Sequence, residues 1–142
     1  MPAKNTVKQY LQDSYYHVYN RGVEKRTIFQ DEQDYKVFLS YLKDYLEPQD
    51  KEKLRRFLKG LSYQKREATI KKIFLNNFAD EIDLLAFCLM PNHFHLLIRQ
   101  KTERGIVDFM KSLGIRYVVY FNKRHKRVGS LFQGRYKAVL ID

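Results

Sequence analysis

The chain has 142 residues, with 27 lysines and arginines against 16 aspartates and glutamates, a formal net charge of +11. This length suits one domain, and a hydrophobic content of 44% is enough for a packed core, which excludes global disorder. The basic excess favours a polyanionic partner, with nucleic acid ahead of an anionic membrane.

The sequence lacks the segments that direct a protein to or across a membrane. Its first 14 residues contain no apolar stretch of the secretory type. The longest apolar run, Leu84–Met90, has seven residues, far fewer than a membrane span needs. It contains the single cysteine, Cys88, which we expect to be a reduced and buried thiol. These features predict a soluble cytoplasmic protein with no membrane partner.

The first half of the chain predicts a strand, a helix and an insertion. Residues 15–20 are β-branched and aromatic, as in a strand. Acidic residues at 31–34 precede apolar residues at three- and four-residue steps, which predicts an amphipathic helix that Pro48 ends. Residues 49–80 are densely charged with two short apolar stripes, and we interpret them as two short helices with solvated charged faces.

The second half predicts two strands, a long helix and a last strand. Ile82–Met90 and His93–Arg99 flank Pro91-Asn92, a pair of residues suited to a tight turn. A helix follows from about Ile106 to Lys123, and a strand covers Arg135–Ile141. The order β-α-insert-β-β-α-β predicts an α+β protein with a ferredoxin-like split βαβ sheet, in one domain over residues 1–142.

The positive charge is concentrated near the end of the sequence. Residues 109–141 contain eight basic residues and no acidic one, interleaved with Tyr, Phe, Asn, Gln and Gly. Cations that bind phosphate beside aromatic rings that stack on bases are typical of nucleic-acid grooves, although a solubilising surface is the alternative. A second, weaker basic cluster occupies residues 20–26.

Two histidines lie two residues apart in a predicted strand. His93 and His95 therefore leave the same face, and Phe94 leaves the opposite one. Two imidazoles at this spacing can bind one metal ion, with a hydrogen-bonded or exposed pair as the alternative. Across the predicted turn Met90 faces His93 and Cys88 faces His95, so further ligands must come from elsewhere. Imidazole ligands alone favour Zn or Mn over Mg.

Four ordered segments of the sequence resemble those of the IS200-like transposases. They are Tyr16–Gly22, Leu89–Leu97, Tyr120–His125 and Gly129–Lys137. The resemblance is closest to the branch associated with repetitive extragenic palindromes, and it runs from about residue 15 to the last residue except for the insert.

This resemblance implies an HUH enzyme, named after two histidines around a hydrophobic residue, here His93-Phe94-His95. Such enzymes have a ferredoxin-like sheet, bind single-stranded or hairpin DNA, and cut it through a tyrosine that becomes linked to the 5′ phosphate. His93 and His95 would then bind a divalent ion, Mg²⁺ or Mn²⁺, which polarises the scissile phosphate. The family includes dimers and monomers, so the resemblance does not decide between a monomer and a homodimer.

On this hypothesis the DNA-binding residues are the turn asparagine and the basic residues of the two clusters. They are Arg21, Lys25, Arg26, Asn92, Lys123, Arg124, Arg127, Arg135 and Lys137. His17 lies on the first strand, a neighbour of the third in this fold, and we interpret it as a hydrogen-bonded strand histidine, with support of the metal ligands as the alternative.

The sequence departs from the family at the nucleophile. The family's catalytic tyrosine lies on a helix after the last strand, whereas this sequence stops at Asp142, so we expect that helix to be absent from the 142 residues. We assign no catalytic tyrosine, because Tyr117 and Tyr120 fall in an apolar stripe and Tyr136 suits stacking or strand packing. A truncated sequence, a substitute tyrosine and a DNA-binding remnant are the three explanations. The alternative functions are a non-catalytic nucleic-acid-binding module and a metal-dependent nuclease that activates water.

Overall fold

The computed structural model describes residues 11–75 and 77–141. The elements in chain order are β1 (Ser14–Arg21), the short 3-10 helix η1 (Val23–Lys25), α1 (Glu32–Leu46), α2 (Lys51–Phe57), α3 (Tyr63–Leu75), β2 (Ile82–Met90), β3 (His93–Gln100), α4 (Gly105–Arg124) and β4 (Lys137–Ile141). Each strand and helix predicted from the sequence is present, and every predicted bound lies within two residues of the observed one.

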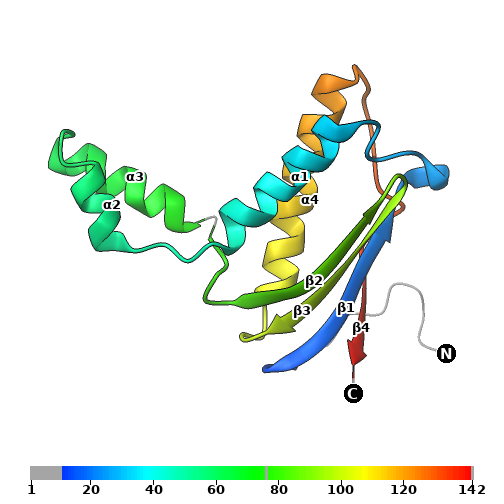
Figure 1. Cartoon of the computed structure of the whole chain (residues 1–142), viewed down its shortest axis with the longest axis horizontal. Helices are drawn as coiled ribbons and strands as arrows, with labels where there is room; N and C mark the ends of the chain where they lie inside the picture. Colours follow the sequence, from blue (N-terminus) through cyan, green and yellow to red (C-terminus); the bar gives the residue numbers. More distant parts are fainter. Residues whose placement is uncertain (1–10, 76, 142) are drawn as a thin grey trace.

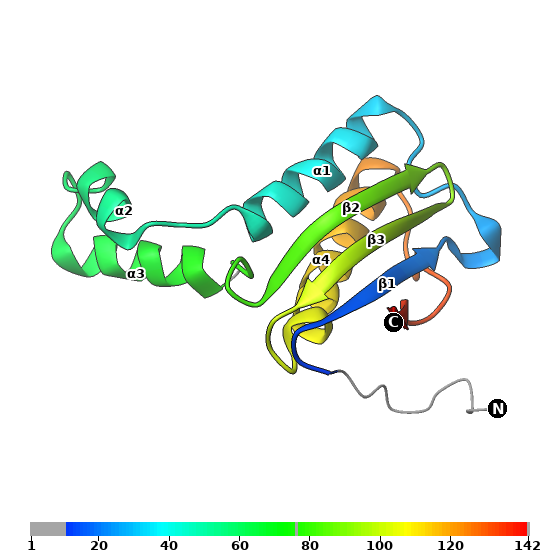
Figure 2. The same cartoon turned by 60° about the horizontal axis from the view of Figure 1, so that its bottom comes forward.

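The sheet has the strand order β2-β3-β1-β4, and each neighbouring pair is antiparallel. This order confirms the predicted α+β class with a ferredoxin-like split βαβ sheet. α1 and α4 lie side by side across one face of the sheet (Figures 1 and 2). None of the helices in the described ranges covers the other face, which we call the open face.

Side chains of the central strands alternate between the two faces. In β3, Phe94, Leu96 and Ile98 are buried under the helices, whereas the residues between them are only partly buried. In β1, Tyr16 and Val18 likewise face the core. This alternation is expected of an antiparallel sheet that is covered on one side only.

The two long helices follow the predicted apolar pattern. α1 begins after Asp31, whose side chain accepts a hydrogen bond from the amide of Asp34, and it ends two residues before Pro48. α4 buries one stripe from Ile106 to Phe121 against the core. Within the described ranges, neither α4 nor another helix is long and apolar enough to cross a bilayer.

α2 and α3 form an excursion from the sheet, as the sequence predicts for residues 49–80. We call Lys51–Leu75 the helical arm. The two helices pack on each other around Ile70, which is 3% exposed. The arm projects past the C-terminal end of α1, away from the sheet (Figures 1 and 2).

The prediction that Cys88 is buried is wrong, because the thiol is exposed. β2 is an edge strand, and Cys88 pairs with His95, whose side chain leaves the open face. An apolar run does not distinguish a strand covered on both faces from one covered on a single face.

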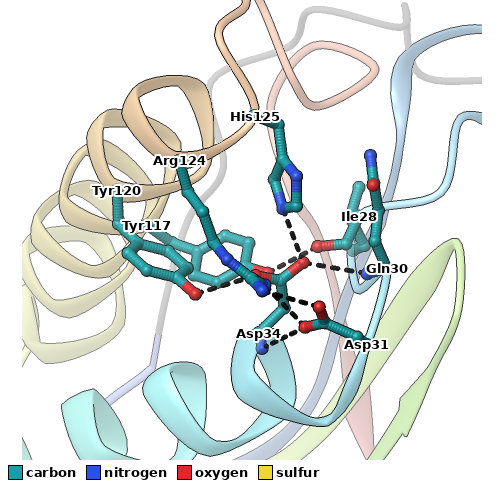
Figure 3. Close-up of polar contacts among 8 residues, drawn as sticks. All are labelled: Ile28, Gln30, Asp31, Asp34, Tyr117, Tyr120, Arg124 and His125. Carbon is teal, nitrogen blue, oxygen red and sulfur yellow. Dashed lines mark hydrogen bonds and ion pairs between the residues drawn. The ribbon is translucent and has the colours of Figure 1, made fainter.

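A buried carboxylate joins the start of α1 to the end of α4. Asp34 is fully buried, and it accepts hydrogen bonds from the backbone amide of Gln30, the Tyr120 hydroxyl, the Arg124 guanidinium and the His125 ring at 2.7–2.9 Å (Figure 3). Burial by itself raises the pKa of Asp34, but these donors outweigh it and the pKa lies below its usual value.

Asp31 extends this cluster to the surface. Its two carboxylate oxygens bind Arg124 at 2.6 Å, and this bidentate pair lowers the pKa of Asp31 to about 2. Asp31 and Asp34 lie just before and in the first turn of α1, and Arg124 lies at the end of α4. Each side-chain charge is opposite in sign to the helix-dipole charge beside it, which is stabilising.

We expect Asp34→Ala to lower the free energy of unfolding by about 2–4 kcal/mol, because it leaves buried donors without an acceptor. Urea denaturation at pH 7 measures this. The matched control is Asp44→Ala, since Asp44 pairs with Arg116 at 3.4 Å but is 60% exposed, and its loss is expected to cost less than about 1 kcal/mol. Equal effects of the two substitutions would contradict a structural role for the cluster.

The cluster also predicts the acid sensitivity of the fold. Both carboxyl groups have a lower pKa in the folded chain than in the unfolded one, so their contribution is complete above their ordinary pKa near 4 and is lost as the pH falls towards 2. Denaturation measured between pH 5 and pH 2 is expected to show a smaller loss of stability in Asp34→Ala than in the wild type. A parallel decline in the two proteins would rule this out.

Candidate metal and nucleic-acid site

The β2–β3 hairpin presents the histidine pair on the open face. The turn consists of Pro91 and Asn92, so that Met90 pairs with His93 and Cys88 pairs with His95. Both pairings agree with the sequence prediction. Neither partner adds an oxygen ligand to the imidazoles.

On the other side of β3, strand β1 places two further side chains beside the pair. Arg21 lies opposite His93, and Tyr19 lies opposite His95. Tyr19 in turn lies opposite Lys137 of β4. Two predicted DNA-binding residues, Arg21 and Lys137, therefore share the open face with the histidines.

One ring nitrogen of each histidine is held by a neighbour. The Nδ1 of His93 lies 2.6 Å from the Oδ1 of Asn92, and the Nδ1 of His95 lies 2.8 Å from the Nε2 of His17. The contact with His17 crosses from β1 to β3, which agrees with the predicted hydrogen-bonded strand histidine. Neither Nε2 of the pair has a hydrogen-bond partner in the described ranges.

The rings form a packed aromatic group. The His17 ring stacks on Tyr19 and on His95, with centroids 4.8 and 5.0 Å away, and His93 meets His95 edge-on at 5.0 Å. Burial, followed by the nearby His17 and His93, lowers the pKa of His95, so its ring is neutral at pH 7. The sequence analysis did not single out Tyr19; its place two residues after His17 in one strand is the signal that puts it on the same face.

The donor chemistry of the pair suits part of a metal site. A neutral imidazole that donates a hydrogen bond from Nδ1 keeps a lone pair on Nε2 for a metal, as is usual for histidine ligands. In the part of the chain that the structure describes, no three His, Cys, Asp or Glu side chains are placed to share one metal ion. The pair can therefore supply two ligands of a divalent ion, and these residues do not add a third.

The loop after β1 is attached to the histidine hairpin. The amide of Gly22 donates to the carbonyl of Asn92, and the amides of Ile28 and Phe29 donate to the carbonyl of Pro91. A side chain at Gly22 would collide with the carbonyl of Arg26. The loop thus holds the exposed Lys25 and Arg26, two predicted DNA-binding residues, beside the turn.

The segment after α4 returns to the same end of the sheet (Figure 1). The amide of Val23 donates to Leu131, and the amide of Gln133 donates to Arg21. Arg127 binds Asn122 and the carbonyl of Ser130, and its pKa is lowered by burial and by the nearby Arg26. The two basic clusters of the sequence therefore meet near the histidine hairpin.

Three predicted DNA-binding residues lie elsewhere. Arg124 points to Asp31 and Asp34 in the carboxylate cluster (Figure 3). Lys123 is exposed near the end of α4. Arg135 lines a cavity of about 290 Å³ on the helix-covered side of the sheet.

The two tyrosines of α4 pack as their apolar pattern predicts. Tyr117 is fully buried and donates to the carbonyl of Ile28, and burial raises its pKa. Tyr120 is partly buried and donates to Asp34. Neither hydroxyl faces the histidine pair.

The fold and the site together define a ferredoxin-like protein with a histidine-hydrophobe-histidine strand on the open face of its sheet. The model of the IS200-like transposase family matches residues 51–142, well over half of the chain. The chain belongs to this family. The match includes the helical arm and begins after β1 and α1, so the Tyr16–Gly22 motif lies outside it.

Two solved structures share the fold at low sequence identity. A REP-associated tyrosine transposase bound to a REP hairpin has a TM-score of 0.52 and 10% identity, over 98% of this chain and 62% of that one. A candidate transposase from Deinococcus radiodurans R1 has a TM-score of 0.53 and 16% identity, over 100% of this chain and 86% of that one. The chain thus spans less than two thirds of the first structure. No curated protein matches the sequence.

We expect Gly22→Ala to destabilise the protein by about 1–3 kcal/mol, because the new methyl group forces the Gly22–Arg26 loop away from the hairpin. Chemical denaturation measures the cost, and amide NMR shifts of Lys25 and Asn92 report the local change. Gly114→Ala is the matched control, since nothing lies near that position in α4 and a helical alanine is favoured by about 1 kcal/mol. Stabilisation by both substitutions would show that the close approach at Gly22 is not required.

Proposed function

We propose that this protein is an HUH-type transposase that binds single-stranded or hairpin DNA and cuts and rejoins one strand at His93 and His95. Membership of the IS200-like family supports the reaction class, and the hairpin-bound state of one structural neighbour supports the form of the DNA. The same proposal makes the chain an enzyme with a divalent metal ion, Mg²⁺ or Mn²⁺, as cofactor.

The observation that carries the proposal is which ring nitrogens of His93 and His95 have hydrogen-bond partners. Asn92 and His17 hold the two Nδ1 atoms, and both Nε2 atoms are left without a hydrogen bond among the described residues. Because the Asn92 oxygen can only accept, the Nδ1 of His93 donates and its Nε2 keeps a lone pair. We propose the same tautomer for His95, with the Nε2 of His17 as the acceptor. His17 and Asn92 thus act as positioning residues, while His93 and His95 would bind the ion.

The proposed reaction is a transesterification. A divalent ion at the pair supplies charge that polarises the scissile phosphate. A tyrosine oxygen loses its proton and bonds to phosphorus, the bond to the 3′ oxygen breaks, and that oxygen takes up a proton as a free hydroxyl. One phosphoester bond replaces another, so rejoining the strands needs no further energy source.

The residues around the pair supply a basic track for the strand. Arg21 and Lys137 flank the histidines on the open face, and Lys25 and Arg26 lie on the attached loop. We propose that they contact phosphates with Asn92, and that Lys123 and Arg127 extend the track, whereas Arg135 lies on the helix-covered side of the sheet, apart from it. Arg124 was predicted to join them, but its guanidinium binds two aspartates, so we propose a structural role for it instead.

Replacing either histidine of the pair is expected to remove metal binding and cleavage while DNA binding survives. His93→Ala and His95→Ala should each weaken Mn²⁺ binding more than tenfold in calorimetry. His17→Phe, which keeps a ring but loses the hydrogen bond, should weaken it about tenfold. His125→Gln is the control, because the fourth histidine binds Asp34 in the carboxylate cluster.

Incubation with a hairpin oligonucleotide separates the candidate reactions. A protein–DNA adduct that resists denaturation establishes the tyrosine mechanism, and mass spectrometry of the adduct identifies the nucleophile. Cleavage without an adduct would instead indicate a nuclease that activates water. Loss of DNA binding along with metal binding in His93→Ala would show that the pair is structural.

A second candidate function is a non-catalytic nucleic-acid-binding module of the same fold. The observation that favours it is that no third His, Cys, Asp or Glu among the described residues is placed to share a metal ion with the histidine pair. Salt-sensitive DNA binding with no Mn²⁺ binding and no cleavage would support this candidate.

A further inference from the structure

The helical arm is strongly basic. Its 25 residues include nine lysines and arginines against two glutamates, a net charge of +7. Both glutamates bind Arg55, and Arg66 lies 3.9 Å from Glu67. The other seven cations form no ion pair with a described residue: Lys51, Lys53, Arg56, Lys59, Lys65, Lys71 and Lys72.

Among the described residues, the arm shares this lack of compensation with the basic residues near the histidine hairpin, whereas several other cations of the protein are paired. Arg99, Arg116 and Arg124 all pair with aspartates in the sheet and its two covering helices. The sequence predicts solvated faces for the charges of residues 49–80. That interpretation agrees with their exposure but does not explain why nine of the thirteen charged residues are basic.

The tip of the arm combines these cations with exposed aromatic side chains. Phe57 ends α2 and is 85% exposed, and Tyr63 begins α3 and is 70% exposed. The Arg66 guanidinium lies over the Tyr63 ring, 5.5 Å from its centroid. Aromatic rings set among cations are the pattern by which proteins bind unpaired nucleic-acid strands, because the rings stack on bases while the cations contact phosphates.

The arm and the histidine pair lie at opposite ends of α1. The residues just before α1 bind the carbonyl of Pro91 in the histidine hairpin, and the residues after it lead into the arm. A helix of 15 residues is about 22 Å long, so the arm cannot reach the phosphate that the pair would bind. Figures 1 and 2 both show the arm extending farther from the sheet.

We propose that the tip of the helical arm is a second DNA-binding surface, which holds an unpaired flank of the strand whose other part lies at the histidine pair. Phe57 and Tyr63 stack on bases of the flank, and Arg56, Lys59 and Lys65 contact its phosphates. The identification of DNA as the bound polyanion rests on the proposed function. The positive charge of the arm and its exposed aromatic side chains are observed independently of that function.

The test measures binding in EDTA, so that metal and cleavage play no part. Fluorescent hairpins with unpaired flanks of zero to about 16 nucleotides cover the range that single-strand binding folds contact. Wild-type affinity is expected to rise with flank length. Phe57→Ala should reduce this gain roughly fivefold to hundredfold, and Lys59→Gln with Lys65→Gln should also lower the salt slope by about 0.7 for each lost contact. The flankless hairpin should bind all variants equally.

The matched control changes the same net charge elsewhere. Lys36→Gln with Lys43→Gln removes two exposed lysines from α1, one of them paired with Glu32, and should leave the flank-dependent gain intact. An equal loss in this control, or a wild-type affinity independent of flank length, would overturn the proposal whatever the histidine variants show.

Binding of flanks by the arm in a protein that neither binds Mn²⁺ nor cuts DNA would overturn the proposed function and leave the arm as a DNA-binding surface. Tight binding to phosphatidylserine vesicles without flank-dependent DNA binding would assign the arm to a membrane surface instead.

Discussion

The antiparallel register of β1 and β3 determines where every side chain of the candidate site lies. It pairs Arg21 with His93 and Tyr19 with His95, and it brings His17 within hydrogen-bond distance of His95. Because side chains alternate along a strand, a shift of one residue would turn the β1 members of this set into the core. The apolar residues Tyr16 and Val18 of β1 oppose such a shift, since they would then face solvent.

The helix layer supports this site from the opposite side of the sheet. Asp34 ties the start of α1 to the end of α4, and the chain segments next to those two ends are the ones that contact the histidine hairpin and β1. Arg124 therefore has a defined partner in the fold, unlike seven of the nine cations of the arm, which pair with no described residue. Arginine therefore has a structural role in Arg124 and a proposed DNA-binding role in the arm. Only the ion-pair partners of these residues distinguish the two roles.

Hydrophobic periodicity and turn chemistry were sufficient to predict the elements, the sheet order and the shared face of His93 and His95. Cys88 shows the limit of an apolar run, which does not reveal whether both faces of a strand are covered. Counting charges along the sequence did not predict the role of Arg124, because its aspartate partners lie about 90 residues away in the chain. The contact between the His17 Nε2 and the His95 Nδ1 joins diagonal positions on two strands, and spacing along one strand does not predict it.

The stiffness of α1 gives its length a meaning beyond packing. One end of this helix is fastened to the hairpin that carries His93, and the other end carries the helical arm. On the two proposals made above, the 15 residues of α1 set the length of DNA between a nucleotide bound by the arm and the one at the histidines. On the same basis, a relative with one more or one fewer turn in this helix would space its two DNA contacts differently, with its histidine pair unchanged.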